Sequence, residues 1–250
     1  MLNKMNKTQI ITISAFLSAL SVVLTRFCSI LVPVGGVPSL SLELGGVPIV
    51  MGGIILGPIW GGIIGFVADV VGFLINPRGG AYFFGFTLNS ILTGVIPGLI
   101  FILFKKQIIK DNWFPKLTYI SLAFITIASA LITLLVLNSE TYNNIIATII
   151  VIGVNIVIFI VLLVLWKKQK ERGVLYQQIL ISVAAVELLV YVLLSPLWLA
   201  MLYGLPYALS MATRVFRMAI SIPVKTLIIS VLLQALRYGI NKKKEGENHG

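Results

Sequence analysis

The stretch "GPIWGGIIGFVADVVGFLINPRGGAYFFGFTLNS", residues 57–90, combines an apolar composition with regularly spaced glycines and one carboxylate, Asp69. Gly61, Gly65 and Gly72 fall within about 40° of one another on a helix. Small residues at such spacing let helices approach closely, so most of these glycines predict tight packing inside a membrane. A charged side chain at this depth usually faces the interior of a bundle. We therefore expect Asp69 to pair with an intramembrane arginine or lysine, and direct contact with a ligand is the less favoured alternative.

The whole chain has the composition of a membrane protein. Of its 250 residues, 58% are hydrophobic and 11% are charged, and the mean hydropathy is +1.04. A soluble domain would have about a quarter of its residues charged. The net charge of +11 does not indicate nucleic-acid binding, because the basic residues lie mainly between apolar runs, as in cytoplasmic loops. One cysteine, Cys28, and one histidine, His249, exclude an internal disulfide and leave no credible transition-metal site.

The apolar segments predict an all-α, polytopic membrane protein with a single membrane domain over residues 1–250 and a polar cytoplasmic tail at 239–250. The first segment is basic and then apolar without a cleavage site, so it is interpreted as a retained span rather than a signal peptide. With both termini in the cytoplasm, the basic clusters at 105–116 and 167–172 and at the two ends all lie on one side, as the positive-inside rule requires. The eight predicted segments are approximately 8–32, 43–56, 58–75, 84–104, 117–137, 144–166, 175–202 and 207–238.

The second segment is unusually short. Its apolar part, "GGVPIVMGGIIL" at 45–56, would form roughly 18 Å of helix, less than the hydrocarbon core of about 30 Å. The preceding "VPVGGVPSLSLE", at 32–43, is rich in Gly, Pro and Ser. Non-helical backbone at membrane depth is buried in protein or lines a wet cavity, so this region is expected to border a cavity. A short tilted helix after an ordinary loop is equally consistent with the pattern.

Six charged residues fall inside the predicted spans away from the segment ends: Arg26, Asp69, Glu187, Arg214, Arg217 and Lys225. In the last helix Arg214, Arg217, Ser221 and Lys225 share a wedge of about 80°. The two carboxylates, together with snorkelling near the helix ends, could neutralise these cations. Four cations against two carboxylates nevertheless favour an anionic ligand. Glu187 shares its helix face with Tyr191 and, more loosely, with Ser195.

A glycine-flanked arginine, Arg78, precedes a run of aromatic residues, "AYFFGF" at 81–86. An interfacial aromatic belt explains this run equally as well as a mobile outer flap that stacks on a flat ring. In the second interpretation, Thr87 and Asn89 supply hydrogen bonds.

Three motifs together resemble the substrate-binding S-components of energy-coupling factor (ECF) vitamin transporters. They are "SAFLSALSVVLTRF" at 14–27, the run from "SLELGG" to "PGLIF" at 41–101, and "RVFRMAISIPVKTLI" at 214–228. The combination of "GPIWGGIIGFVADVVG" with "GGAYFFGFTLN" is most similar to the folate-specific, FolT-like branch. The resemblance covers roughly 8–104 and 175–238 and implies an S-component-like helical bundle.

The resemblance implies a non-enzymatic protein of the prokaryotic plasma membrane that captures folate from outside. Such a protein docks with a membrane T-component and two ATP-binding subunits and topples to release its cargo. It needs no cofactor of its own, since only the partner subunits use ATP, and the chain has no "GxxxxGK[ST]" loop. Ala15 and Ala19 match the family's Ala-x-x-x-Ala surface for the T-component.

The resemblance also implies roles for the candidate site residues. Arg26, Arg214 and Arg217 are assigned to the glutamate or carbonyl groups of folate. Phe73, Tyr82 and Phe86 are assigned to stacking, and Asp69, Thr87 and Asn89 to pterin hydrogen bonding or pocket support. Arg26 lies within about 20° of Ala15 and Ala19, so it can reach a pocket only from the outer end of its helix.

The family typically has six helices, so the segments within 117–166 are interpreted as an inserted transmembrane hairpin. Its apolar cores carry no charge, which favours a lipid-facing position at the edge of the bundle. An influence on docking to the partner subunits is the second interpretation.

Other functions stay open. Within the class, the ligand could be pantothenate, a pyridoxine-type compound or a pyrimidine precursor. An intramembrane enzyme would need paired carboxylates or a nucleophile with a base, whereas Asp69 and Glu187 stand on separate helices without an intramembrane histidine. An autonomous secondary transporter is less favoured, because the two halves of the sequence show no convincing repeat.

Overall fold

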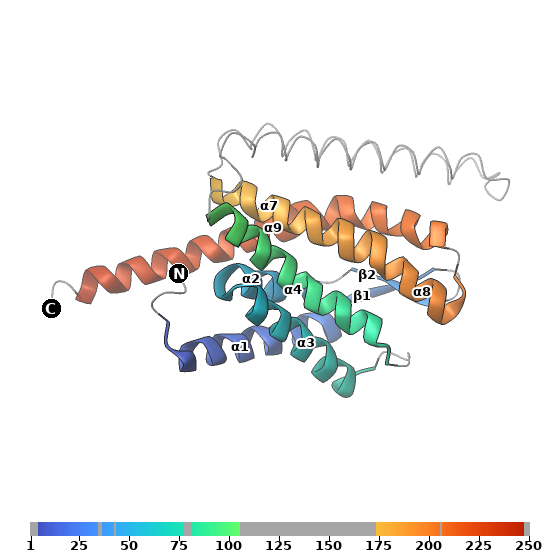
Figure 1. Ribbon diagram of the computed structural model, residues 1–250, viewed down its shortest axis with the longest axis horizontal. Coiled ribbons are helices and arrows are strands. Elements are labelled where there is room, and N and C mark those ends of the chain that lie inside the picture. The colour runs from blue at the N-terminus through green and yellow to red at the C-terminus, as the bar shows by residue number, and fades with distance from the viewer. Residues whose placement is uncertain are drawn as a thin grey trace.

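The structure is a computed structural model that describes residues 5–34, 37–42, 44–77, 82–105, 174–205 and 207–247 (Figure 1). The predicted hairpin within 117–166 and Arg78 lie outside these residues. The described elements are α1 (Lys7–Arg26), β1 (Ile30–Val34), β2 (Val37–Leu42), α2 (Gly46–Leu56), α3 (Pro58–Ile75), α4 (Phe84–Lys105), α7 (Val174–Val186), the π-helix η2 (Glu187–Leu194), α8 (Ser195–Tyr203) and α9 (Tyr207–Glu247).

Four described helical stretches are long and apolar enough to cross a membrane: Lys7–Arg26, Pro58–Ile75, Phe84–Lys105 and Leu175–Tyr203. Two shorter apolar helical stretches, Gly46–Leu56 and Ser221–Leu236, accompany them. The bounds of α3 agree with the predicted span at 58–75, and α4 ends one residue later than predicted. α9 continues to Glu247, through most of the expected polar tail, because its lysines and glutamates are good helix formers.

Among the described residues, a short β-hairpin follows α1 in an otherwise helical structure, so the all-α prediction is confirmed, but the first predicted segment extends too far. The first predicted segment, 8–32, ends as a helix at Arg26, and β1 then pairs antiparallel with β2. Pro33 lies opposite Pro38, next to an irregularity in the register. Prolines lack the N–H that a continuing helix needs, and the neighbouring valines and isoleucine favour extended backbone. The predicted non-helical backbone before the second helix is therefore confirmed.

The short helix α2 occupies the centre of the bundle (Figure 1) and packs against α1, α3, α4 and α9. All of its residues are buried except Ile54 and Ile55. A helix that is apolar all round is stable only where other elements surround it. Its 11 residues confirm the prediction of a short second helix and explain how so short an element is accommodated.

Glycines bring α3 and α4 into close contact, as the spacing predicts. A Cβ added at Gly65 would overlap the Ser90 carbonyl oxygen, and one at Gly94 would overlap the Gly61 carbonyl. Because the obstacle in each case is backbone, no larger residue fits without moving a helix. Gly57, at φ 91°, makes the sharp turn from α2 into α3.

The span at 175–203 contains a π-helical segment in its middle. The backbone N–H of Ser195 donates to the carbonyl of Val190, five residues earlier, which is the π pattern. Pro196 follows, and its ring would clash with the Val192 carbonyl in a regular α-helix. The wider turn of η2 relieves this conflict and keeps the span continuous.

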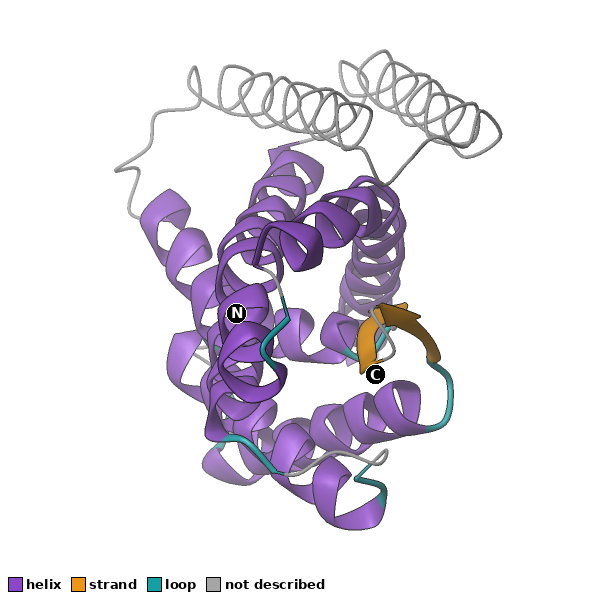
Figure 2. Cartoon of the chain, turned by 90° about the vertical axis from the view of Figure 1, so that its right-hand side faces the viewer, coloured by secondary structure: helices purple, strands orange, loops and turns teal. Residues whose placement is uncertain are grey.

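Two apolar cores hold the helices together. One joins α2, α7, η2 and α9, with Val50, Ile179 and Ile222 among its members. The other joins α1, α2 and α3 through Leu17 and Ile64. Seen from one end (Figure 2), the hairpin lies at the end of the bundle where α1 and α3 finish and α9 begins.

Candidate functional site

A polar cluster links α1, α3 and α4 near the hairpin end of the bundle, and we call Arg26, Asp69, Tyr82 and Thr87 the Asp69 cluster. Arg26 Nη2 lies 3.8 Å from Asp69 Oδ1, and the two side chains are 10% and 18% exposed. Thr87 Oγ1 donates to Asp69 Oδ2 at 2.7 Å, and the Tyr82 hydroxyl lies 2.7 Å from Thr87 Oγ1. The prediction that Asp69 pairs with an intramembrane arginine is confirmed.

Arg26 reaches this cluster from the last position of α1. Its Nη1 donates to the carbonyl of Asn76, just beyond α3, at 3.0 Å. Gly72 leaves space for the Arg26 side chain, since a Cβ at position 72 would lie 2.8 Å from Arg26 Nε. The position at the helix end explains how Arg26 points to α3 although it shares a helix face with Ala15 and Ala19, which are exposed.

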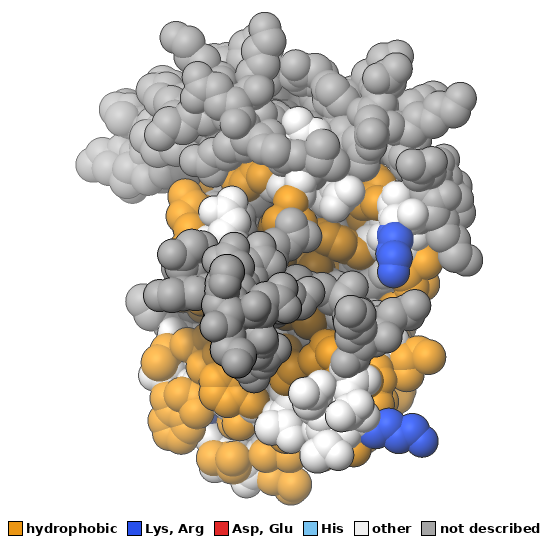
Figure 3. Space-filling view, turned by 90° about the vertical axis from the view of Figure 1, so that its left-hand side faces the viewer, with side chains coloured by type: hydrophobic (Ala, Val, Ile, Leu, Met, Phe, Trp, Pro, Cys, Tyr) orange, Lys and Arg blue, Asp and Glu red, His pale blue; other side chains and the backbone are white. Residues whose placement is uncertain are grey.

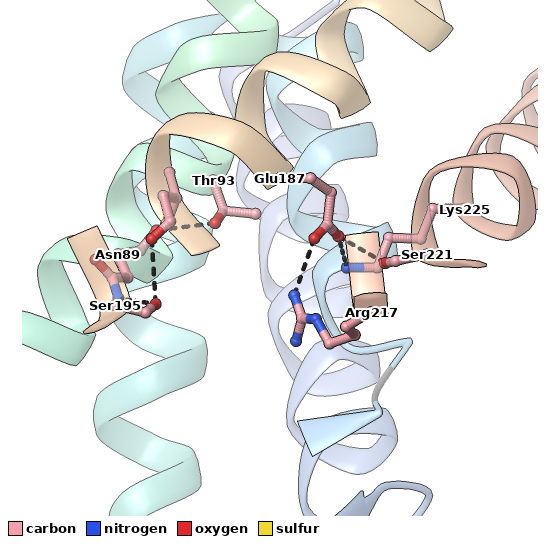
Figure 4. A network of polar contacts seen from close by, with 8 residues as sticks. Asn89, Thr93, Glu187, Ser195, Arg217, Ser221 and Lys225 are labelled. Atoms are coloured by element: carbon pink, nitrogen blue, oxygen red, sulfur yellow. Dashed lines mark hydrogen bonds and ion pairs between the residues drawn. The ribbon is translucent and has the colours of Figure 1, made fainter. Parts of the chain in front are cut away.

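A second cluster, the Glu187 cluster, links η2 to α9 and contains Glu187, Tyr191, Arg217, Ser221 and Lys225. Figure 4 shows Glu187 with Arg217, Ser221 and Lys225. The Glu187 carboxylate accepts hydrogen bonds from Lys225 Nζ at 2.7 Å, Ser221 Oγ at 2.6 Å and Arg217 Nη2 at 3.0 Å. The Tyr191 ring centroid lies 4.3 Å from Arg217 Cζ and 5.0 Å from Lys225 Nζ. Glu187 thus binds two of the three cations on the predicted face of α9. This agrees with the interpretation that an intramembrane carboxylate neutralises these cations.

A third cluster couples α4 to α8 through Asn89 (Figure 4). Its Nδ2 donates to Ser195 Oγ at 2.9 Å, as Figure 4 shows. Its Oδ1 accepts from Trp198 Nε1 at 3.0 Å. Thr93 Oγ1 donates to the Asn89 carbonyl at 2.8 Å. Both ends of the Asn89 amide are therefore engaged by protein groups, which favours pocket support over direct pterin recognition.

Aromatic rings gather around the start of α4. Phe73 and Tyr82 meet edge to face at 5.2 Å between centroids, Phe83 and Phe86 at 5.9 Å, and Phe83 lies 5.8 Å from Trp198. Trp198 was not singled out from the sequence, because nothing in the spacing of "SPLWLA" distinguishes it from a lipid-facing tryptophan.

The predicted site residues therefore fall into separate groups. The Asp69 cluster brings together Arg26, Asp69, Tyr82 and Thr87, with Phe73 beside it. Arg217 belongs to the Glu187 cluster, and Arg214, at 6% exposure, is buried one turn nearer the start of α9. Sequence reasoning did not include Lys225, Ser221, Tyr191 or Glu187 in the site, although their shared helix faces could have indicated them.

Comparison with known proteins decides the family. The family described as the ECF-type riboflavin transporter, S component, matches residues 5–171, more than half of the chain. The chain belongs to this family. It is an S component, a non-enzymatic binding protein of the cell membrane, and the resemblance drawn from the motifs is confirmed.

Two similar proteins bear on this S component further. The folate transporter FolT from Clostridium novyi (strain NT) is 39% identical over 97 residues, which is 39% of this chain and 53% of that protein. The match thus spans about half the length of that relative. A crystal structure of FolT bound with folic acid has a TM-score of 0.53 and 23% identity, over 90% of each chain. At that identity the likeness establishes the S-component fold.

Proposed function

We propose that this S component binds folate from the outer side of the membrane and delivers it through a T-component and two ATP-binding subunits. The observation that carries the proposal is the gathering of buried cations and aromatic rings inside an apolar bundle, in the Asp69 and Glu187 clusters. Folate combines a flat pterin, a benzoate and two carboxylates, so it needs both kinds of partner. The 39% identity with FolT over 97 residues supports the same ligand.

The residue roles follow from chemistry and position. Arg26, Arg214 and Arg217 are the candidates for the carboxylates or carbonyl groups, and Phe73, Tyr82 and Phe86 for stacking. Thr87 and Asp69 hold one another and Arg26 in place at the hairpin end, so their contribution is pterin binding or support of the pocket. Asn89 supports the pocket by holding Trp198 and Ser195.

The proposed topology has about eight helices and both termini in the cytoplasm. Lys7 begins α1 and Lys105 ends α4, and both are exposed at the end of the bundle opposite the hairpin. In the view of that end (Figure 3), the coloured side chains of the described residues include basic but no acidic ones. Basic residues favour the cytoplasmic side, which supports ligand entry from the hairpin end.

The proposed docking surface for the T-component is the face of α1 that carries Ala15 and Ala19. Both alanines are exposed, and Phe16, at 66% exposure, lies beside them. Small residues flatten a helix surface and allow another helix to approach closely, which suits a membrane partner.

Riboflavin is the second candidate, because the matching family is described as a riboflavin transporter component. Its isoalloxazine ring would also suit the aromatic residues around α4. Riboflavin carries no carboxylate, however, so it would bring no negative charge to the buried, positively charged face of α9.

The test is calorimetric titration of the purified chain in detergent with folic acid and with riboflavin, using pantothenate and pyridoxine as controls. Protein whose absorbance spectrum shows no co-purified pterin or flavin should bind folic acid tightly, at one molecule per chain and without ATP. Binding of riboflavin but not folic acid by folded protein would replace the proposed ligand while keeping the transporter class.

A further inference from the structure

The Glu187 cluster contains a buried carboxylate that the proposed ligand contacts do not use. Glu187 is 1% exposed and accepts hydrogen bonds from three side chains of α9. We propose that Glu187 is a positioning residue that sets ligand specificity by charge. It holds Arg217 and Lys225 in place and limits how much negative charge a ligand can bring into the bundle. This inference rests on the proposed function in one respect, that the ligand is a flat-ring molecule captured within this bundle.

The charges inside the bundle give the reason. Apart from Arg237 at the cytoplasmic end of the last span, the predicted spans contain four cations and at most three carboxylates, with Glu43 at the start of the second span included. A positive surplus therefore remains within an apolar bundle, where interactions between charges are several-fold stronger than in water. A ligand anion stabilises such a surplus, whereas each further ligand charge without a cation is costly to bury. Removing the Glu187 charge would enlarge the surplus by one.

Two features of the backbone indicate that the Glu187 cluster has a functional role as well as a packing role. The π-helix keeps Glu187 and Tyr191 directed at the same pair of cations, and π segments occur frequently at functional sites. The start of α2 also lies here, since a Cβ at Gly46 would be 3.5 Å from Lys225 Nζ and 3.5 Å from the Tyr191 hydroxyl. The positive end of the α2 dipole adds to the positive potential around Lys225, and Glu187 offsets it.

The experiment measures a ratio of affinities between ligands that share a ring and differ in charge. Pteroate and folate form one pair, with one and two carboxylates. Riboflavin and riboflavin 5′-phosphate form the other. Wild type and Glu187→Gln are both titrated with the pair of ligands that the wild type binds. In the variant, the preference for the more anionic ligand of that pair should be about tenfold higher than in the wild type. Lys225→Gln should lower the same preference, and the double variant Glu187→Gln/Lys225→Gln, which restores the original net charge, should return it toward the wild type.

A merely structural role would weaken both members of a pair equally and leave the ratio unchanged, and that result would overturn the inference. Ser221→Ala is the matched control, because it removes one hydrogen bond to Glu187 without changing charge and should leave the ratio unchanged. If Glu187→Gln does not fold, Lys225→Gln alone tests the inference, because it should lower the preference for the more anionic ligand. Charge discrimination within the riboflavin pair, without folate binding, would support this inference and reject the proposed folate ligand. Binding of neither pair by folded wild-type protein would overturn it.

Discussion

The Asp69 and Glu187 clusters each hold a carboxylate inside an apolar bundle, but different contacts stabilise the two carboxylates. Asp69 lies about 9 Å from the end of α3 and faces Arg26 at 3.8 Å, with both side chains partly exposed. Arg217 and Lys225 lie about 15 Å and about 27 Å along α9, and both bind Glu187 at 3.0 Å or less with exposures of 5% or less. The first cluster is therefore held by fewer short, buried contacts than the second.

The sharpest test of this contrast removes each carboxylate in turn. Glu187→Ala leaves two cations buried without that partner and should lower the free energy of unfolding by about 3–5 kcal/mol. Asp69→Ala should cost less, about 2–3 kcal/mol, because it removes one short hydrogen bond from Thr87 and an ion pair that is long and partly exposed. Thermal unfolding of the purified variants in detergent measures both. Equal losses would show that the two clusters are not different in kind.

The arginines of α9 should separate by their effect on ligand binding and on stability. Arg214→Ala should weaken folate binding by at least about tenfold, equivalent to about 1.4 kcal/mol, while leaving the Glu187 cluster intact. Arg217→Ala should lower the unfolding temperature more than Arg214→Ala does, because it removes a buried donor to Glu187. An unchanged affinity in Arg214→Ala would remove that residue from the site.

Hydroxyl donors to the two carboxylates should also differ in importance. Thr87→Val removes the 2.7 Å hydrogen bond to Asp69, and hydrogen bonds to charged groups contribute about 1.5–3 kcal/mol. Ser221→Ala should have a smaller effect on stability, since Glu187 keeps both charged donors. Chemical unfolding of the two variants side by side compares the losses, and a larger loss in Ser221→Ala would reverse the ranking.

The smallest expected effects concern the glycines that border each cluster. Gly72→Ala should push the flexible Arg26 side chain aside and weaken ligand binding a few-fold, with a stability change within about 0.5 kcal/mol. Gly46→Ala meets Lys225 and Tyr191 only at ordinary contact distance and should change neither property. Calorimetric titration of the pair is the measurement, and loss of binding in Gly46→Ala alone would move the ligand toward the Glu187 cluster.

Much of the fold could be predicted from the sequence because glycine spacing and hydropathy act locally. They located α3 to the residue, identified the short α2 and predicted the close approach of α3 and α4. The β-hairpin could not be distinguished from a loop, because two prolines in a short extended run fit either conformation. The end of α9 was placed too early, since hydropathy marks the end of an apolar segment and not the end of a helix.

The candidate site was less accessible from sequence alone. Helical angles placed the cations of α9 on one face, and the pairing of Asp69 with an arginine followed from the cost of an isolated charge in lipid. The choice among partners depends on which helices are neighbours, which a single sequence does not specify. The link from Asn89 to Trp198, across 109 positions of the chain, therefore appeared only in the structure.

The π-helical segment has a consequence for how this chain can change in length. Because η2 contains one residue more than a regular helix would need for its bonding pattern, a deletion anywhere between 187 and 194 could convert it to an α-helix without breaking the span. Because the π pattern already absorbs that residue, everything after the deletion would keep roughly its angle relative to α7. Ser195 and Trp198 would stay beside Asn89, while the side chains between the deletion and Ser195 would move to other faces of the helix. A deletion here would thus redirect residues of η2 such as Tyr191 without uncoupling α4 from α8.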